Sequence, residues 1–231
     1  MIKALKKLVI VSLIASAIMV TSGFQSLPIL PITGFHENLS TNHQKVDPYE
    51  NIFLDDYLET EQANQESRKL QELLNSVLDG QSDVIKGLYV KGGLALEVIQ
   101  QPSGQPAYVS STDDAITEFS MARKYGVIGM LAHNYLAGSF FYEIKIGDIV
   151  NIVYGDGEVN KYLVTDIQSY QALQPTSPHS QFLDMSTNEK LSATQLFYKV
   201  YTGNPHLTLQ TCIQEGSVDS WGRLFIIAEP I

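Results

Sequence analysis

The sequence predicts a mainly β protein, folded as a sandwich or a closed barrel, and three observations support this prediction. From position 86 onward, seven short apolar runs of five to eight residues recur along the chain. Glycine, proline, asparagine and serine residues separate them, as is typical of turns. Gly155-Asp156-Gly157 joins two of the runs as a hairpin turn. Many short strands with turn residues between them favour a sandwich or a barrel. The seven runs are Lys86–Val90, Leu94–Ile99, Val127–Ala132, Ile149–Tyr154, Lys161–Gln168, Leu207–Cys212 and Leu224–Ala228.

The first 24 residues predict export. Lys3, Lys6 and Lys7 precede an apolar run from Leu8 to Val20, and small residues follow. This order is that of a signal peptide. The apolar run is short for a membrane span, although residues 4–24 together are long enough to serve as an uncleaved membrane anchor. We therefore expect an exported protein, either secreted or held at the cell surface, with cleavage and anchoring both open.

Residues 25–85 are expected to be a linker that carries one helix. Leu27 to Gly34 contains two prolines and is expected to form a stiff spacer, and the polar stretch from His36 to Leu54 has no period. Further on, five apolar residues share one helical face, and Gly80 provides a stop. This helix is expected to pack on the flank of the β domain; the alternative is a helix that binds a partner. The five residues are Leu70, Leu73, Leu74, Val77 and Leu78.

Two helices and one loop are expected between the strands. Thr112 can cap a helix that carries Ala115, Ile116, Phe119 and Ala122 on one side and ends at Gly126. Ser192-Ala193-Thr194-Gln195 is a capping-box pattern that opens a second helix. The stretch from Ser169 to Asn188 holds two prolines and several serines and is expected to be an irregular, exposed loop.

The composition sets limits on function. The 231 residues are 44% hydrophobic and 17% charged, which suits one sizeable core with a tail. The formal charge is −10, and because the first 24 residues hold three lysines and no acid, the remainder stands at −13. An acidic body of this kind argues against binding nucleic acid. The single cysteine excludes an internal disulfide framework.

That cysteine is the first candidate for chemistry. Cys212 ends the run from Leu207, a polar loop follows, and Arg223 opens the last run. If the two runs pair as antiparallel neighbours, the thiol and the guanidinium lie at the same end of the sheet. The alternatives are a buried, inert cysteine and a solvated surface arginine. A cysteine nucleophile also needs a proton-transfer partner. His133 is the candidate, because it ends the run Val127–Ala132.

These residues resemble the sortase family. His133 with Asn134 at a strand end, then Thr208-Leu209-Gln210-Thr211-Cys212, then Arg223 on the last strand are similar to the sortase pattern of His, a TLxTC strand and a downstream Arg. The stretch from Phe140 to Val153 is also similar to the sortase segment after the histidine. The resemblance covers roughly residues 87–231 and implies a closed β-barrel of about eight strands with short helices over residues 86–231.

The resemblance also implies roles and partners. Cys212 would form a thioacyl enzyme with a sorting-signal peptide, His133 would transfer protons, and Arg223 would hold the substrate and the developing oxyanion. Thr211 and Asn134 would support the substrate groove and orient the imidazole. The second substrate would be an amine of the cell envelope or of a pilin-like protein. No metal and no cofactor is expected, because the sequence has neither the spacing of a zinc site nor a recognisable calcium loop.

Within the spacer, Leu30-Pro31-Ile32-Thr33-Gly34 spells LPxTG, the peptide that the best-known sortases cleave between Thr and Gly. Sorting signals lie near a C-terminus, whereas this one follows the apolar segment. It is therefore either a plain spacer or an intramolecular pseudo-substrate. Two further functions stay open: a cysteine peptidase that releases the peptide by hydrolysis, and a secreted β-barrel that binds a partner without turnover. The papain-like order, with Cys before His, is the reverse of this chain.

Overall fold

A computed structural model describes residues 48–231, with side chains from residue 58 onward. These residues belong to one compact unit. The predicted signal or anchor segment, residues 1–24, and the LPITG stretch at residues 30–34 lie outside the described residues. Within residues 48–231, no helix has both the length and the apolar character that crossing a membrane requires.

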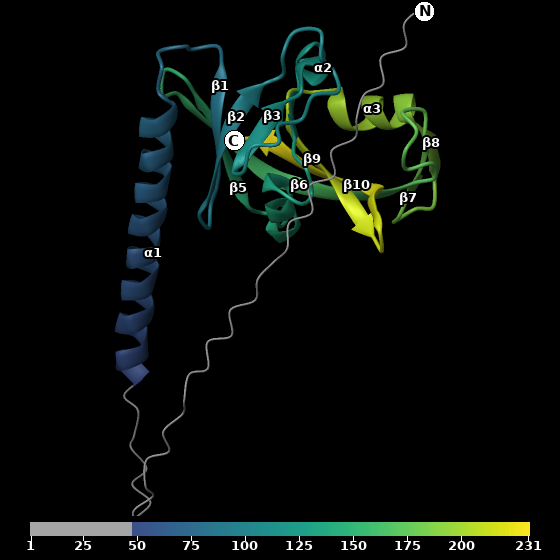
Figure 1. Cartoon of the computed structure of the whole chain (residues 1–231). Helices are drawn as coiled ribbons and strands as arrows, with labels where there is room; N and C mark the ends of the chain where they lie inside the picture. The colour runs from purple at the N-terminus through teal and green to yellow at the C-terminus, as the bar shows by residue number, and fades with distance from the viewer. Residues whose placement is uncertain (1–47) are drawn as a thin grey trace, which may run out of the picture. The chain divides into compact units, whose positions relative to one another are not determined.

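Residues 48–231 form one long helix followed by ten strands and three short helices (Figure 1). In order, these are α1 (Pro48–Val77), β1 (Ile85–Val90), β2 (Leu94–Gln100), β3 (Ala115–Glu118), α2 (Ser120–Arg123), β4 (Ile128–Leu131), the 3-10 helix η1 (Ala137–Glu143), β5 (Ile149–Tyr154), β6 (Val159–Ala172), β7 (Gln181–Asp184), β8 (Lys190–Ser192), α3 (Ala193–Tyr201), β9 (Leu207–Glu215) and β10 (Val218–Pro230).

Eight of the strands close into a barrel. They follow one another in the order β10-β9-β4-β3-β2-β1-β5-β6, and β6 pairs back with β10 along Tyr162–Gln171 and Gly222–Pro230. Two neighbours are parallel, β2 with β3 and β4 with β9; the other pairs are antiparallel. The remaining strands, β7 and β8, extend the sheet beyond β6. The predicted fold class, a mainly β closed barrel of about eight strands with short helices, is confirmed.

Alternate residues of the strands fill the barrel. On β9, Leu207 and Leu209 are fully buried inside, and on β10 Leu224, Ile226 and Ala228 occupy the same interior. The residues between them therefore face outward, because successive side chains of a strand point to opposite faces. This alternation decides which strand residues can form a surface site.

Two separate hydrophobic clusters cover parts of the barrel's outer surface. The α3 cluster joins α3, β7 and β8 to the outer faces of β6 and β10 and contains ten buried residues. The α1 cluster joins α1 to β1 and β5 and contains three: Leu73, Tyr89 and Val153. Figure 1 shows α3, β7 and β8 gathered beside β9 and β10. The predicted capping box of α3 is confirmed: Ser192 Oγ accepts from Gln195 N, and Gln195 Oε1 accepts from Ser192 N.

One predicted helix is wrong. Residues 115–118 form β3, and only Ser120–Arg123 are helical. Ile116 lies in the barrel core, and β3 pairs with β2 on one side and β4 on the other. The apolar positions at 115, 116, 119 and 122 fit a helical period, but the barrel needs a strand here to close the gap between β2 and β4. Tertiary pairing thus overrides the local pattern.

Two further expectations are corrected. The loop expected over residues 169–188 is partly regular, because β6 continues to Ala172 and β7 occupies Gln181–Asp184. Helix α1 is longer than expected: it begins at Pro48, inside the stretch expected to be an irregular linker. On its apolar face, Leu70, Leu74 and Val77 pack against the α1 cluster. Leu78 follows the helix and is exposed. Gly80, the predicted stop, adopts a positive φ of 83°.

Candidate active site

Cys212 and Arg223 lie directly opposite one another in the structure. Strands β9 and β10 pair as predicted, and the register makes Cys212 and Arg223 Cα partners. The polar loop expected between them is wrong, because β9 continues to Glu215 and β10 already begins at Val218. Side chains of directly opposed residues in an antiparallel pair share one face, with Cβ atoms about 4.5–5.5 Å apart. Leu209 and Leu224 face the interior, so the alternation places the thiol and the guanidinium together on the barrel's outer face. Both residues are half-buried.

His133 reaches the same level of the sheet from β4. Strand β4 runs parallel to β9, with Leu131 opposite Gln210. The contact continues one residue further: Ala132 N donates to Gln210 O at 3.1 Å, and Thr211 Oγ1 donates to Ala132 O at 3.0 Å. His133 is the next residue, so the shared register brings it level with Cys212. It is half-buried.

The segment after His133 is held in place by hydrogen bonds. The carbonyl of His133 accepts from Leu136 N and from Gly138 N, both at 3.0 Å. Gly138 has to be glycine, because a Cβ there would overlap Thr211 Oγ1 and lie 2.7 Å from the His133 carbonyl. Asn134 Nδ2 donates to Asp219 O at 3.1 Å, which ties the segment to the start of β10.

Thr211 and Asn134 each form a hydrogen bond between separate segments of the site, and their predicted roles toward the substrate and the imidazole stay predictions. Thr211 is 1% exposed and donates to Ala132 O, so its side chain holds β9 against the residue that follows β4. The Asn134 amide nitrogen bonds to β10 and not to the imidazole. Both residues fix the position of the segment that carries His133.

Two tyrosines beside these residues were missed by sequence reasoning. The Tyr135 ring stacks on the His133 ring, with centroids 5.1 Å apart and planes 19° apart, and Tyr135 is 65% exposed. Tyr142, on η1, donates its hydroxyl to the carbonyl of Cys212 at 2.6 Å. Burial raises the pKa of the Tyr142 hydroxyl, and the charge of Cys212 raises it further. Neither tyrosine stands in a pattern that marks it in the sequence; only the fold brings Tyr142 to a residue 70 positions away.

The guanidinium of Arg223 is supported by backbone and by an aromatic ring. Nη1 donates to Ser220 O at 3.0 Å and to Gly222 O at 2.7 Å, and the guanidinium carbon lies 5.9 Å from the centroid of the Phe182 ring. Within residues 58–231, no carboxylate forms an ion pair with it. Its positive charge is therefore not neutralised by a neighbour and is available to an anionic or developing negative group.

The α3 cluster supports the neighbouring part of β9. Gln210, two residues before Cys212 and on the same outer face, accepts at Oε1 from Tyr201 Oη at 2.7 Å. Thr208 Oγ1, two residues earlier, donates to Val200 O at 2.7 Å. Burial raises the pKa of Tyr201, so the phenol stays a neutral donor. Thr208, Gln210 and Cys212 are thus three successive outward-facing residues of β9, and the first two are hydrogen-bonded to α3.

Among the described residues, no group of three or more His, Cys, Asp or Glu side chains could hold a metal ion. What the structure does bring together is a thiol opposite a guanidinium and, level with them, an imidazole stacked on a tyrosine. These are the groups that a covalent acyl-transfer site uses.

No protein-family model and no curated protein matches the chain. Solved structures do: the chain is similar to sortase A from Listeria monocytogenes, with 14% identity, a TM-score of 0.42 and coverage of 66% of this chain and 88% of that one. It is similar to sortase C1 from Streptococcus suis, with 16% identity, a TM-score of 0.43 and coverage of 80% and 86%. A third is a Clostridium perfringens sortase D5 transpeptidase, with 13% identity, a TM-score of 0.41 and coverage of 73% and 88%. All three are sortases, the family that the sequence motifs resemble.

Proposed function

We propose that the protein is a sortase-like cysteine transpeptidase. It cleaves an LPxTG-type sorting peptide through a thioacyl enzyme and transfers the acyl group to an amine at the cell surface. The observation that carries the proposal is the register of three strands: β9 and β10 place Cys212 opposite Arg223, and the parallel pair of β4 and β9 brings His133 to the same level. The TLxTC strand between the histidine and the arginine supports the same reading.

In the first half of the proposed reaction, the Cys212 thiolate attacks the carbonyl of the threonine in the peptide. Arg223 stabilises the oxyanion that develops on the carbonyl oxygen, with the donors that its backbone contacts leave free. The bond to the glycine nitrogen then breaks, and His133 gives that nitrogen a proton. The products are a thioester on Cys212 and a free amine.

In the second half, a neutral amine attacks the thioester carbonyl. The carbon–sulfur bond breaks, an amide forms, and the proton that the amine loses passes to His133. Cys212 is left as the thiolate, ready for another cycle. Water in place of the amine would give hydrolysis through the same steps, so the identity of the acceptor separates a transpeptidase from a peptidase.

The test is incubation of the full-length protein with an LPxTG peptide library, with and without an added amine, followed by mass spectrometry of protein and products. We expect an acyl adduct on Cys212 that the amine converts to a transfer product. Cys212→Ala should abolish both species, and His133→Ala should prevent acylation. A wild-type protein that forms no adduct with any peptide, and whose thiol is inert to a peptide vinyl sulfone, would contradict the proposal and favour a binding module.

The chain's own Leu30–Gly34 provides a second arm of the same experiment. As a self-substrate, it would give a self-acylated species in the absence of added peptide, and replacing Pro31 and Thr33 would remove that species and change the turnover of added peptide. As a spacer, it would leave both unchanged. The proposed site of action, the cell surface, follows from the signal or anchor sequence of residues 1–24 and is tested by fractionating cells that express the full-length chain.

A further inference from the structure

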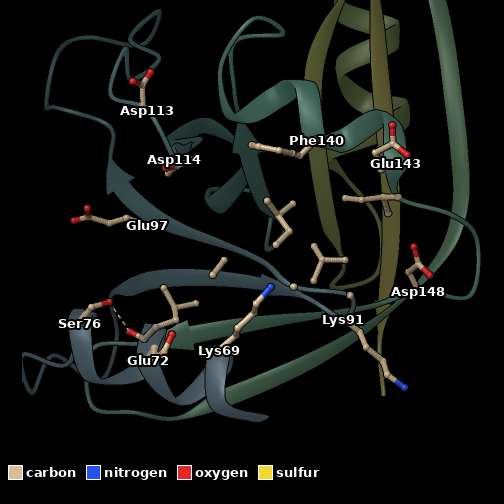
Figure 2. Close-up of a pocket in the computed structure, with 17 residues that line it drawn as sticks. Lys69, Glu72, Ser76, Lys91, Glu97, Asp113, Asp114, Phe140, Glu143 and Asp148 are labelled. Carbon is tan, nitrogen blue, oxygen red and sulfur yellow. Dashed lines mark hydrogen bonds between the residues drawn. The ribbon is translucent and has the colours of Figure 1, made fainter. Parts of the chain in front are cut away.

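A cavity of about 970 Å³ lies beside the segment that supports Cys212, and the proposed chemistry does not use it. Its walls come from α1, from the β1–β2 turn, from the chain before β3 and from η1 (Figure 2). Its volume is at the upper end of the range of small-ligand pockets. Two of its features, an acidic rim and an apolar lining, together define the chemistry of an occupant.

The rim is acidic. Figure 2 shows Glu97, Asp113 and Asp114 on one side of the cavity and Glu143 and Asp148 on the other. Glu72 adds a sixth carboxylate, whereas Lys69 and Lys91 are the two lysines that line the cavity, so its formal charge is −4. Within residues 58–231, no ion pair joins either lysine to one of these acids. The negative charge is therefore open to a cation from outside.

The lining is largely apolar. Leu73, Val90, Leu94 and Ile144 contribute hydrocarbon surface, and the Phe140 ring is 44% exposed at its edge. A site of this kind suits a segment with alternating cationic and apolar side chains, which can bury its apolar groups while its charges meet the acidic rim. An anionic peptide is repelled by the same rim.

The helix η1 connects this cavity to the candidate active site. Phe140 and Glu143 are three residues apart and therefore lie on one face of a 3-10 helix, which has three residues per turn. Tyr142 lies on a different face and donates its hydroxyl to the Cys212 carbonyl. One wall of the cavity is thus the element that touches the residue carrying the nucleophile.

We propose that this cavity, the acidic pocket, binds a cationic segment of the amine acceptor, which orients the acceptor for attack on the thioester. This inference rests on the proposed function. The pocket holds residues that flank the reacting amine, and the reacting amine itself lies outside it at Cys212. Six carboxylates would raise the pKa of a bound amine and keep it protonated, whereas the attacking amine must be neutral.

The test uses two acceptor peptides that differ only in charge. Each begins with triglycine, which supplies a single reactive amine, and continues with alternating leucine and either arginine or glutamate; each has a fluorophore at its C-terminus. The pocket variant E97Q/D113N/E143Q removes three exposed carboxylates that have no hydrogen-bond role among the described residues. The matched control E59Q/E189Q/E229Q removes three exposed carboxylates that do not line the pocket.

We expect the arginine peptide to bind the wild-type protein at least tenfold more tightly than the glutamate peptide in fluorescence anisotropy. The arginine peptide should bind the pocket variant about tenfold more weakly than the wild type, and the control variant less than twofold more weakly. The preference of the wild type for the arginine peptide over the glutamate peptide should decline as salt is added. The kcat/KM for transfer to the arginine peptide should fall by a similar factor in the pocket variant. Hydrolysis of the acyl donor without acceptor should stay within twofold of wild type.

Equal binding by the wild-type protein and the pocket variant would overturn the acidic pocket as the acceptor site. So would an equal loss in both triple variants, because that result would reflect only the net charge of the protein. If the pocket variant alone loses binding while no form of the protein acylates Cys212, the pocket remains a site for cationic segments and the proposed transpeptidase function fails. The binding measurement therefore tests the acidic pocket, and the acylation measurement tests the transpeptidase function, independently of one another.

Discussion

The two hydrophobic clusters on the outside of the barrel, the α3 cluster and the α1 cluster, differ in how many residues they bury. Each lies next to a different site: the α3 cluster beside the candidate active site and the α1 cluster beside the acidic pocket. The α3 cluster buries ten hydrophobic residues against the outer surface; α3 holds Thr208 and Gln210 beside the candidate active site, and Phe182 of the cluster lies against Arg223 within it. The α1 cluster buries three residues, and the acidic pocket opens at its edge. A well-packed cover fixes side chains in position, whereas a thin one leaves space for a ligand. The predictions that follow test this contrast, from the largest expected effect to the smallest.

The largest effect is expected at Arg223. Arg223→Lys keeps the positive charge but removes the fork that bonds to two backbone carbonyls while leaving further donors free. We expect kcat/KM for the acyl donor to fall by about 10²–10³-fold, the usual cost of losing an oxyanion donor, with the melting temperature nearly unchanged. The measurement is steady-state turnover with thermal unfolding as control. Activity within threefold of wild type would show that Arg223 only supports the backbone of β10 at Ser220 and Gly222.

Substitution of one buried leucine in each cluster compares the packing of the α3 cluster and the α1 cluster directly. Leu196 lies on α3 and Leu73 on α1, and both are buried. We expect Leu196→Ala to lower the free energy of unfolding by about 3–4 kcal/mol and Leu73→Ala by about 2 kcal/mol. The reason is that the α1 cluster is small, so the helix can shift to fill the space. Chemical denaturation measures both. Equal losses would show that the two covers are equally well packed.

Asp184 on β7, which is bonded to Lys199 on α3, provides a pH-dependent test of how firmly the α3 cluster is held. The Ser186 hydroxyl donates to its carboxylate, as do the Ser186 and Thr187 amides and Lys199. These bonds, the Ser186 hydroxyl first, hold the pKa of Asp184 well below its usual range, although burial acts in the opposite direction. Because the folded pKa is lowered, the stabilisation is complete above the ordinary Asp value of about 4 and is lost as the pH falls toward the folded value.

We therefore expect Asp184→Asn to cost about 1–3 kcal/mol at pH 7 and much less at pH 2–3. Denaturation of the wild type and of the variant across this pH range measures the difference. A cost that stays constant with pH would mean that the hydrogen-bond geometry, and not the charge, provides the stabilisation. Ser186→Ala serves as the matched control, because it removes the hydroxyl donor and leaves the carboxylate.

The smallest effect is expected at Tyr142. Tyr142→Phe removes the hydrogen bond to the Cys212 carbonyl but keeps the ring. We expect a loss of about 1 kcal/mol in stabilisation of the transition state, which corresponds to a five- to tenfold decrease in kcat with little change in KM. Single-turnover acylation monitored by mass spectrometry isolates the step. A change in KM alone would mean that Tyr142 contacts the peptide and does not position the nucleophile. Phe140→Leu, in the same helix but on the face that lines the acidic pocket, is the control for acylation.

Sequence patterns predicted the strands with clear local signals and missed those without them. β5 has the bounds that its apolar run predicts, and the α3 capping box has its own short signature. β3 was mistaken for a helix because four residues are too few to establish a period, and its identity comes from pairing with β2 and β4. β7 and β8 were missed because four and three residues among turn formers carry no strand pattern of their own.

The sequence by itself determined which residues make up the candidate site: one thiol at the end of an apolar run, a histidine that follows another run and an arginine that precedes the last run, in an acidic chain. The pairing of β9 with β10 was also predictable, because two apolar runs lie close together in the sequence, but the extension of both strands into the polar stretch between the runs was not. Only the tertiary structure decided that β4 lies parallel to β9, that Tyr142 reaches Cys212 and that α1 and η1 enclose an acidic pocket. Contacts between distant segments depend on how the barrel closes, and no local pattern encodes that closure.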